Sequence, residues 1–184
     1  MPPWIERVVQ RVAPLANWED LTLSEEALAT MRRIQSDMQE RIDDSRSKNG
    51  SKNKGKPRSG VIAVFNGPQG PHKITAAEVL AKELQMNLFR IDLSLVVSPT
   101  LEETERIMKR IIDGAEVAGG VLFFDQAELL FERDEEGADV DKGIGYLVKR
   151  AGRYEDLAII AVPDKGQMDL VHLRKLHNVV DFPG

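Results

Sequence analysis

Cysteine is absent from this chain of 184 residues. Without a thiol the chain can form no disulfide, no thiolate zinc site and no cysteine nucleophile. These absences exclude a small domain held together by disulfides, a zinc-finger module and a cysteine hydrolase.

Long hydrophobic runs are also missing. No stretch of the sequence approaches the roughly 20 apolar residues that a membrane-spanning helix requires. The opening residues, MPPWIERVVQRV, are amphipathic but mix acidic and basic side chains, which is not the pattern of a secretory signal. We therefore expect a cytoplasmic protein with no membrane partner.

An excess of positive charge is lacking as well. The net charge is −5, which does not favour general binding to nucleic acids. What remains is ordinary for a globular protein, with 42% hydrophobic and 30% charged residues. A chain of about 150 residues buries roughly 70% of its unfolded surface. We expect one domain, or one domain preceded by an arm.

Residues 1–44 are predicted to be a helical arm, with the helical pattern running over residues 4–44. Apolar residues recur at helical spacing between Leu28 and Ile42. Ser24, followed by two glutamates, is typical of a helix start. The pattern favours an ordinary amphipathic helix that lies on the core.

Residues 45–59 contain no large apolar side chain and many Ser, Asn, Gly and Lys residues. This composition predicts a flexible basic linker. Its positive charges suit contact with phosphate or with an acidic partner, although a solvated linker is the simpler interpretation.

From residue 60 onward, short apolar runs alternate with helical patterns. The expected strands are residues 60–66, 87–94, 119–126, 157–163 and 178–183, and the expected helices are residues 74–85, 101–118, 126–133 and 142–154. Nearly continuous apolar strands are typical of a parallel sheet that is buried on both faces. The alternation predicts a three-layer α/β domain with a parallel five-stranded sheet, whose ligands bind at the carboxyl ends of the strands.

The stretch VFNGPQGPHKITAAEVL, residues 64–80, has the outline of a phosphate-binding loop between a strand and a helix. The candidate nucleotide-binding residues are Gly67, Pro68, Gln69, Gly70, Pro71, His72, Lys73 and Ile74.

The chain resembles the core domain of AAA ATPases. The likeness includes NWEDLTLSEEAL before the core, the loop, NLFRIDLSLVVS, EETERIMKRIIDGAE, GGVLFFDQAELLF, LAIIA and LRKLHNVVDFP, in the family's order. It implies a P-loop NTPase-like fold with residues 60–184 as the AAA core. The family continues into a small helical lid after this core, and we expect the lid to be absent.

In the loop, the resemblance assigns Lys73 to the β- and γ-phosphates. Pro71 has no N–H to offer, and His72 stands where the family has glycine. His72 either contacts phosphate as a cation or is an exposed histidine in a loop that no longer works. Ile74 replaces the hydroxyl residue that binds Mg²⁺, and Thr75 lies about 100° further round the helix.

Other catalytic positions of the family are also changed. Asp125 is retained and is the candidate metal ligand, with a helix cap as an equal alternative. Gln126 replaces the acid that activates water, and an amide cannot accept that proton. Pro163 occupies the place of the polar sensor. Arg174 remains at a finger position of the family, while Lys175 and His177 occupy the neighbouring finger positions.

Together these replacements predict a pseudo-ATPase that keeps the fold and acts as a protein-interaction or assembly module. Its expected partner is a complete AAA relative or a second copy of the chain, and no cofactor is required. One alternative is a switch that binds ATP or ADP weakly. Another is an ATPase with residual activity, for which ATP and Mg²⁺ are the cofactors.

Overall fold

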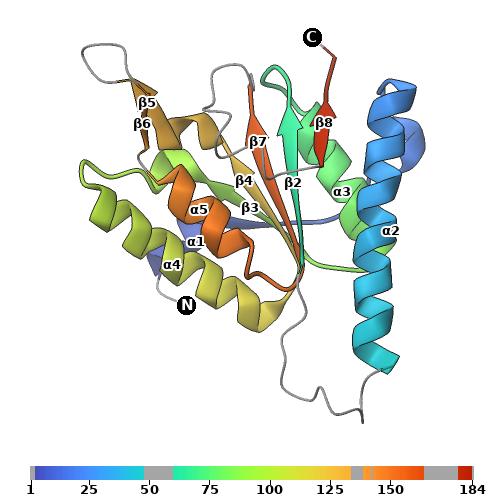
Figure 1. The fold of residues 1–184 in the computed structure, drawn as a ribbon, viewed down its shortest axis with the longest axis horizontal. Helices are drawn as coiled ribbons and strands as arrows, with labels where there is room; N and C mark the ends of the chain where they lie inside the picture. Colours follow the sequence, from blue (N-terminus) through green and yellow to red (C-terminus); the bar gives the residue numbers. More distant parts are fainter. Residues whose placement is uncertain (1–2, 48–59, 134–138, 142, 164–177, 184) are drawn as a thin grey trace.

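The structure is a computed structural model that describes residues 3–47, 60–133, 139–141, 143–163 and 178–183. At its centre, apolar runs of the sequence form parallel strands. The strands are β2 (Val61–Asn66), β3 (Leu88–Asp92), β4 (Val121–Asp125), β7 (Leu157–Val162) and β8 (Val179–Asp181). They run parallel to one another in the spatial order β3-β4-β7-β2-β8. These are the five strands that the apolar runs predict (Figure 1).

A sixth strand, β1 (Val9–Val12), corrects the prediction of a five-stranded, wholly parallel sheet. It pairs antiparallel with β3, with Val9 opposite Ile91 and Val12 opposite Leu88. The prediction of helix throughout residues 4–44 is therefore wrong at this point. Only four residues long and exposed at its two middle positions, β1 has too little apolar alternation to stand out in the sequence. It covers the edge of β3 that would otherwise be open for pairing.

Helices cover both faces of the sheet (Figure 1). On one face lie α2 (Glu25–Ser47) and α3 (His72–Leu84). On the other lie α4 (Leu101–Ala118) and α5 (Ile144–Ala151), with the short α1 (Pro3–Val8) at their side. Each face buries its own apolar cluster, so the predicted three-layer α/β class is confirmed.

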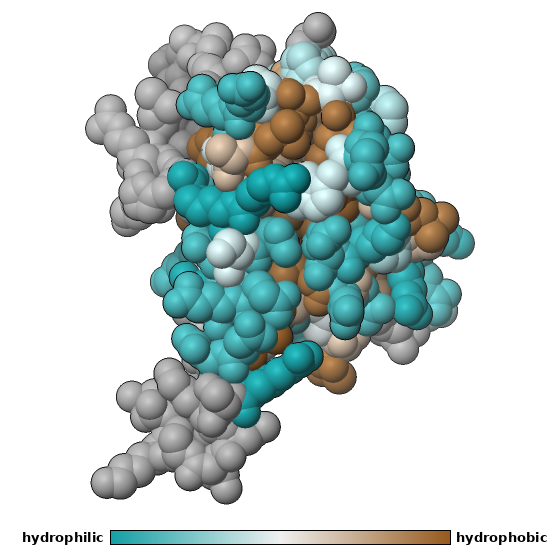
Figure 2. Space-filling view, turned by 90° about the vertical axis from the view of Figure 1, so that its right-hand side faces the viewer, coloured by the Kyte–Doolittle hydropathy of each residue, from teal (hydrophilic) through white to brown (hydrophobic). Residues whose placement is uncertain are grey.

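Helix α2 is the amphipathic helix that the sequence predicts. Its start is capped by Ser24, whose hydroxyl accepts a hydrogen bond from the Ala27 amide at 3.1 Å. Met31, Ile34 and Met38 are fully buried against the sheet. The side of the molecule that carries α2 is mainly hydrophilic, with hydrophobic residues gathered towards the end where β2 and β8 finish (Figure 2).

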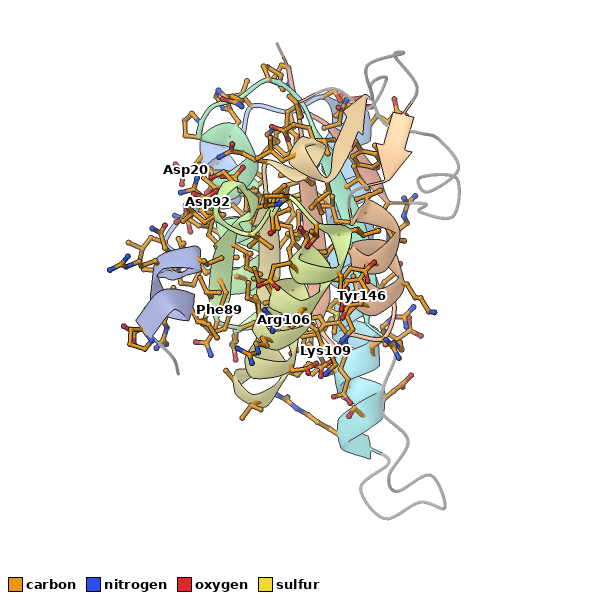
Figure 3. All side chains as sticks on the ribbon, turned by 90° about the vertical axis from the view of Figure 1, so that its left-hand side faces the viewer. Asp20, Phe89, Asp92, Arg106, Lys109 and Tyr146 are labelled. Carbon is orange, nitrogen blue, oxygen red and sulfur yellow. The ribbon has the colours of Figure 1, made fainter. Side chains whose placement is uncertain are left out.

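Helix α4 has the same division. Arg106 and Lys109 lie on its outer side, where each forms an ion pair with a carboxylate one turn away, while Ile111 and Ile112 are buried (Figure 3). Arg150 of α5, 9% exposed, bridges to Asp113 of α4 and joins the two helices.

The segment after β4 is not the helix predicted for residues 126–133. Gln126 has a positive φ of 60°, which turns the chain sharply at the end of the strand. A single 3-10 turn, η3 (Ala127–Leu130), follows, and β5 (Phe131–Arg133) then pairs antiparallel with β6 (Asp139–Asp141). The apolar spacing of this segment suits a helix, but the sharp turn at Gln126 and the pairing of β5 with the nearby strand β6 override it.

Two further expectations have no structural outcome. Residues 48–59 of the predicted basic linker lie outside the described residues, while residues 45–47 belong to α2. The division into an arm, a linker and a core stays a prediction. Among the described residues, no helix is long and apolar enough to cross a membrane.

Candidate nucleotide-phosphate site

The predicted loop lies at the carboxyl edge of the sheet, between the end of β2 and the first residue of α3 (Figure 1). Two of its glycines have a positive φ, 158° at Gly67 and 148° at Gly70. A Cβ added at Gly67 would lie 2.7 Å from the Cβ of Phe182, whereas at Gly70 its nearest neighbour is 3.9 Å away. Packing against Phe182 is thus enough to explain Gly67, and phosphate binding need not be invoked for it.

The base of the loop is tied to two neighbouring strands. The Gly67 amide donates to Val162 O of β7 at 3.1 Å, and the Phe182 amide donates to Asn66 O at 2.7 Å. These bonds hold the loop at the edge where ligands bind in parallel α/β sheets.

Lys73 is the buried cation of the site, with 6% of its surface exposed. Its ammonium group donates to Gly67 O at 2.7 Å and to Val162 O at 3.0 Å. Burial lowers the pKa of Lys73, and the negative charges of Asp125 and Glu128 oppose that shift. The lysine therefore connects the loop to β7 and lies in the field of two carboxylates.

The first turn of α3 offers little to a metal ion. Ile74 packs against the apolar cluster between the sheet and α2–α3. The Thr75 hydroxyl donates to Pro71 O at 2.7 Å, so it is engaged within its own helix. Pro71 and His72 are exposed, as are Pro68 and Gln69 ahead of them.

Asp125 ends β4 and is held by an arginine that the sequence reading did not single out. Arg90 of β3 donates to Asp125 Oδ2 from Nε at 2.9 Å and from Nη2 at 2.5 Å. The strand register allows this contact, because Arg90 lies beside Phe123 and Asp125 is two residues further along the same strand, on the same face. An arginine between the apolar residues Phe89 and Ile91 was the available signal, since a charge in such a setting favours a partner.

Glu128 was also missed, and it lies in η3, close enough to Lys73 and Asp125 to feel their charges. Its Oε2 is buried and has no hydrogen-bond partner among the described residues. Burial raises the pKa of this carboxyl group, while Lys73 acts in the opposite direction. The sequence signal was an acid three residues after Asp125, which a 3-10 turn can return towards the loop.

The remaining predicted positions contribute no charge here. Gln126 is partly buried at the turn, and its carbonyl accepts from the Leu129 amide at 3.1 Å. Pro163 follows β7 and is partly buried. Arg174 and the KLH residues of the finger segment lie outside the described residues.

The residues present do not fit a magnesium ion well. Ligation of Mg²⁺ beside a nucleotide uses a loop hydroxyl and an acidic strand end. Here Ile74 brings no oxygen, the Thr75 hydroxyl bonds to its own helix, and Asp125 is paired with Arg90. The fit to a phosphate group is better, because Lys73 and the amides at the start of α3 remain at the loop.

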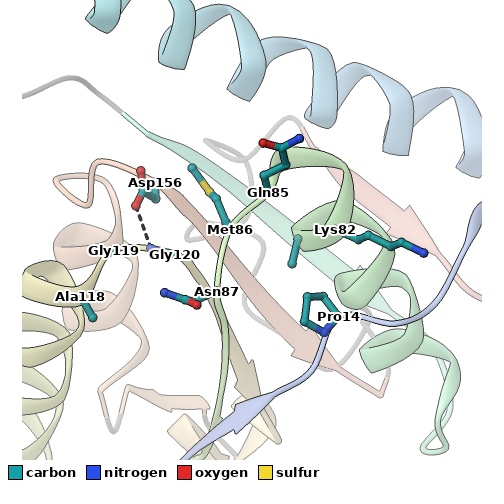
Figure 4. Close-up of a pocket in the computed structure, with 10 residues that line it drawn as sticks. Pro14, Lys82, Gln85, Met86, Asn87, Ala118, Gly119, Gly120 and Asp156 are labelled. Carbon is teal, nitrogen blue, oxygen red and sulfur yellow. Dashed lines mark hydrogen bonds between the residues drawn. The ribbon is translucent and has the colours of Figure 1, made fainter.

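Two cavities are candidates for the ligand site. One of about 230 Å³ adjoins the loop, lined by Asp20, Leu21, Thr22, Leu23, Pro71, His72, Thr75 and Phe182. Another of about 430 Å³ lies at the opposite edge of the sheet, beside Asn87, Gly120 and Asp156 (Figure 4). Since parallel α/β sheets bind ligands at their carboxyl edge, we assign the functional site to the loop side despite its smaller cavity.

Comparison with known proteins agrees with this fold and loop. The model of the ATPase family associated with various cellular activities (AAA) matches residues 63–165. The chain belongs to the AAA family. It is 32% identical over 130 residues to a protein of Sinorhizobium fredii (strain NBRC 101917 / NGR234) described as the uncharacterized AAA family ATPase y4kL. The match covers 70% of this chain and 37% of that relative, so the chain spans much less than the relative's length.

This membership confirms the AAA-type core that the order of the motifs predicts. The matched residues include the loop, Asp125 and Pro163. They make the chain an AAA ATPase-like domain of the nucleotide-binding type.

Proposed function

We propose that this AAA core is a pseudo-ATPase, which keeps the fold and the loop but does not hydrolyse ATP, and which acts through protein contact as an assembly or regulatory module. Its partner is a second copy of the chain or a complete AAA relative. No metal ion takes part in this role.

The proposal rests on the residues at the positions where the family binds Mg²⁺ and activates water. The Asp125 carboxylate is paired with Arg90, and the partly buried side chain of Ile74 packs against the apolar cluster and offers no oxygen. Gln126 also lacks the carboxylate that would activate water, and loss of such assistance costs about 10²- to 10⁴-fold in rate. These features lie at the end of β4 and in the first turn of α3, so a change at one place would not restore the other.

A second candidate is a switch that binds ATP or ADP weakly without turnover. The geometry of Lys73 favours it, because its ammonium is already held at the loop by two carbonyl groups. Nucleotide at 100 times its dissociation constant would add about 2.7 kcal/mol to stability. A rise in melting temperature with millimolar ATP or ADP would support the switch.

An ATPase assay tests the proposed function. Purified protein with ATP and Mg²⁺ is compared with the Lys73→Ala variant, and Lys82→Ala serves as the matched control because Lys82 is an exposed lysine on the same helix. We expect no difference in phosphate release among the three proteins. Turnover that disappears in Lys73→Ala and persists in Lys82→Ala would contradict the proposal.

The assembly role needs a separate measurement. The molar mass of the purified chain, measured by light scattering over a range of concentrations without nucleotide, tests association with a second copy. Capture from the source cells, followed by identification of the captured proteins, tests association with a complete AAA relative. A strictly monomeric chain that captures no AAA protein would contradict this part of the proposal.

A further inference from the structure

The cavity at the amino edge of the sheet has no part in the chemistry of the loop. Its wall is built from residues that immediately precede three parallel strands, from the end of α3 and from the connection that follows β1 (Figure 4). Its volume of about 430 Å³ lies within the range of roughly 300–1,000 Å³ that is typical of binding pockets. A hollow of this size can receive apolar side chains of a partner.

Val117 is the most exposed large hydrophobic side chain in the described part of the chain, at 91%. It lies in the last turn of α4, one residue before Ala118, which lines the cavity. The side of α4 that packs on the sheet carries Ile111, Ile112 and Ala115 instead. Val117 therefore contributes nothing to the core and leaves an apolar side chain at the rim of the cavity.

A second apolar side chain, Leu15, lies beside the same cavity and is 74% exposed. It follows Pro14, which lines the cavity. The Leu15 amide donates to Ala13 O at 3.0 Å and to Glu78 Oε1 at 3.2 Å. These bonds hold the backbone against α3, so the side chain is presented from a fixed position. Such preorganisation lowers the entropic cost of binding.

Two projecting side chains and a hollow thus lie together on one surface, which we call the amino-edge patch: Leu15, Val117 and the cavity. A two-fold interface brings the same patch of both copies together, so each patch must supply both the projections and the hollow. We propose that the amino-edge patch is a self-association surface, on which two copies of this chain pack about a two-fold axis and cover each other's Leu15 and Val117. The inference rests on the part of the proposed function that gives the chain a second copy as its partner, and it adds the surface and the stoichiometry.

Charge also favours a second copy as the occupant. The lining of the cavity includes one cation, Lys82, and one carboxylate, Asp156. Two copies that meet here bring both signs to the contact, so the lining sets no excess of like charge against their approach. The other exposed large hydrophobic side chains of the described residues, Leu95 and Leu101, follow the end of β3, at the carboxyl edge. A dimer through the amino edge therefore leaves the loop of both copies accessible.

The test is the molar mass of the purified chain, measured by light scattering over a range of concentrations without nucleotide. Wild-type protein should approach twice the mass of one chain. Val117→Lys replaces a projecting side chain with a charge, so the dissociation constant of the dimer should rise about tenfold or more. Ala118→Trp fills the cavity from an exposed position and should weaken the dimer as well. Leu101→Lys is the matched control, because it makes the same kind of change at an exposed leucine at the other end of α4, and it should leave the dimer unchanged.

Three results would overturn the inference. They are a wild-type chain that stays monomeric at every concentration, an association that either Val117→Lys or Ala118→Trp leaves intact, and equal weakening by Leu101→Lys. Thermal melts verify that each variant is folded. An association that ignores the patch would still leave a second copy as the partner in the proposed function, and a monomeric chain would leave the complete AAA relative. ATP turnover would contradict the proposed function without deciding the state of association.

Discussion

The carboxyl group of Glu128 lowers the stability of the folded state when it is charged, because it is buried. Its pKa is raised by burial, so the folded state holds the proton more tightly than the unfolded chain does. A carboxyl group whose pKa is higher in the folded state than in the unfolded state stabilises the fold at pH values below its unfolded pKa. This stabilisation is lost as the pH rises through the folded pKa.

From this sign we predict that Glu128→Gln raises the melting temperature at pH 7 to 8. The advantage should shrink as the pH falls, because wild-type Glu128 then takes up its proton and resembles glutamine. Thermal melts of both proteins from pH 4 to pH 8 measure the difference. The control is Glu83→Gln, which makes the same change in charge at an exposed position of α3. A difference that is constant over this range, or a variant that is less stable at pH 8, would show that ionised Glu128 does not strain the fold.

The two loop glycines allow a second prediction, because only one of them is packed. Both would cost about 1–2 kcal/mol when replaced by alanine, since their φ values are unfavourable for a side chain. At Gly67 the new methyl group would also collide with Phe182, adding about 1–3 kcal/mol of overpacking.

Urea unfolding of Gly67→Ala and Gly70→Ala measures the two costs side by side. We expect Gly67→Ala to be the less stable variant by about 1–3 kcal/mol. Equal losses would mean that β8 can move away from the loop without penalty.

Between elements, a buried tyrosine connects the amino ends of two strands. Tyr154, 1% exposed, donates from its hydroxyl to Gly120 O just before β4, and the Asp156 carboxylate accepts from the Gly120 amide at 2.8 Å. Both residues lie in the short connection from α5 to β7. The pair therefore sets where β4 and β7 begin relative to each other.

Tyr154→Phe should lower the free energy of unfolding by about 1–2 kcal/mol, because it leaves a buried carbonyl without this hydrogen bond. Tyr146→Phe, at a partly buried position of α5, is the control, and we expect it to change stability by about 0.5 kcal/mol or less. Both values come from urea unfolding. A Tyr154→Phe variant as stable as the control would mean that the carbonyl finds another donor.

Elements with a strong pattern of apolar residues could be predicted from the sequence. Short strands that form only by backbone pairing could not. Helix α4 occupies the residues that its apolar spacing predicts, from Leu101 to Ala118. The five parallel strands follow from their apolar runs. Strand β1 has a weak local pattern and forms because β3, which is distant in the sequence, offers its backbone. Strands β5 and β6 are three residues each and form by pairing with each other.

The site divides in the same way. The loop and Asp125 follow from motif spacing in the sequence. Arg90 and Glu128 could not be placed, because one depends on the register between β3 and β4 and the other on the 3-10 turn after β4. Contacts of this kind are set by tertiary structure and leave only a charge in an apolar context as a clue.

For the molecule as a whole, the positions that hydrolysis would need are spread over several strands of one sheet and the helix after the loop. The loop belongs to β2 and α3, Asp125 to β4, Arg90 to β3, and Pro163 follows β7. A repair confined to one element should therefore restore only what that element supplies.

The final prediction concerns the triple variant Pro71→Thr, His72→Gly and Ile74→Thr. It returns one N–H donor, backbone room and the hydroxyl for Mg²⁺, which act on bound nucleotide. Thermal melts should show stabilisation by ATP with Mg²⁺, against a basal loss of about 1 kcal/mol because Ile74 leaves the core.

Turnover by the triple variant should stay absent, because Asp125 remains paired with Arg90 and Gln126 accepts no proton. Adding Gln126→Glu should still give little activity, since Pro163 offers no polar group to orient water. An arginine finger supplied by a neighbour is worth about 10³ to 10⁵ in rate in related phosphoryl-transfer enzymes, and the loop repair leaves that contribution unchanged. Phosphate release by the triple variant alone, at a rate that Lys73→Ala removes, would mean that the loop was the sole barrier to catalysis. Nucleotide-dependent stabilisation without turnover is the outcome that a site altered on several elements requires.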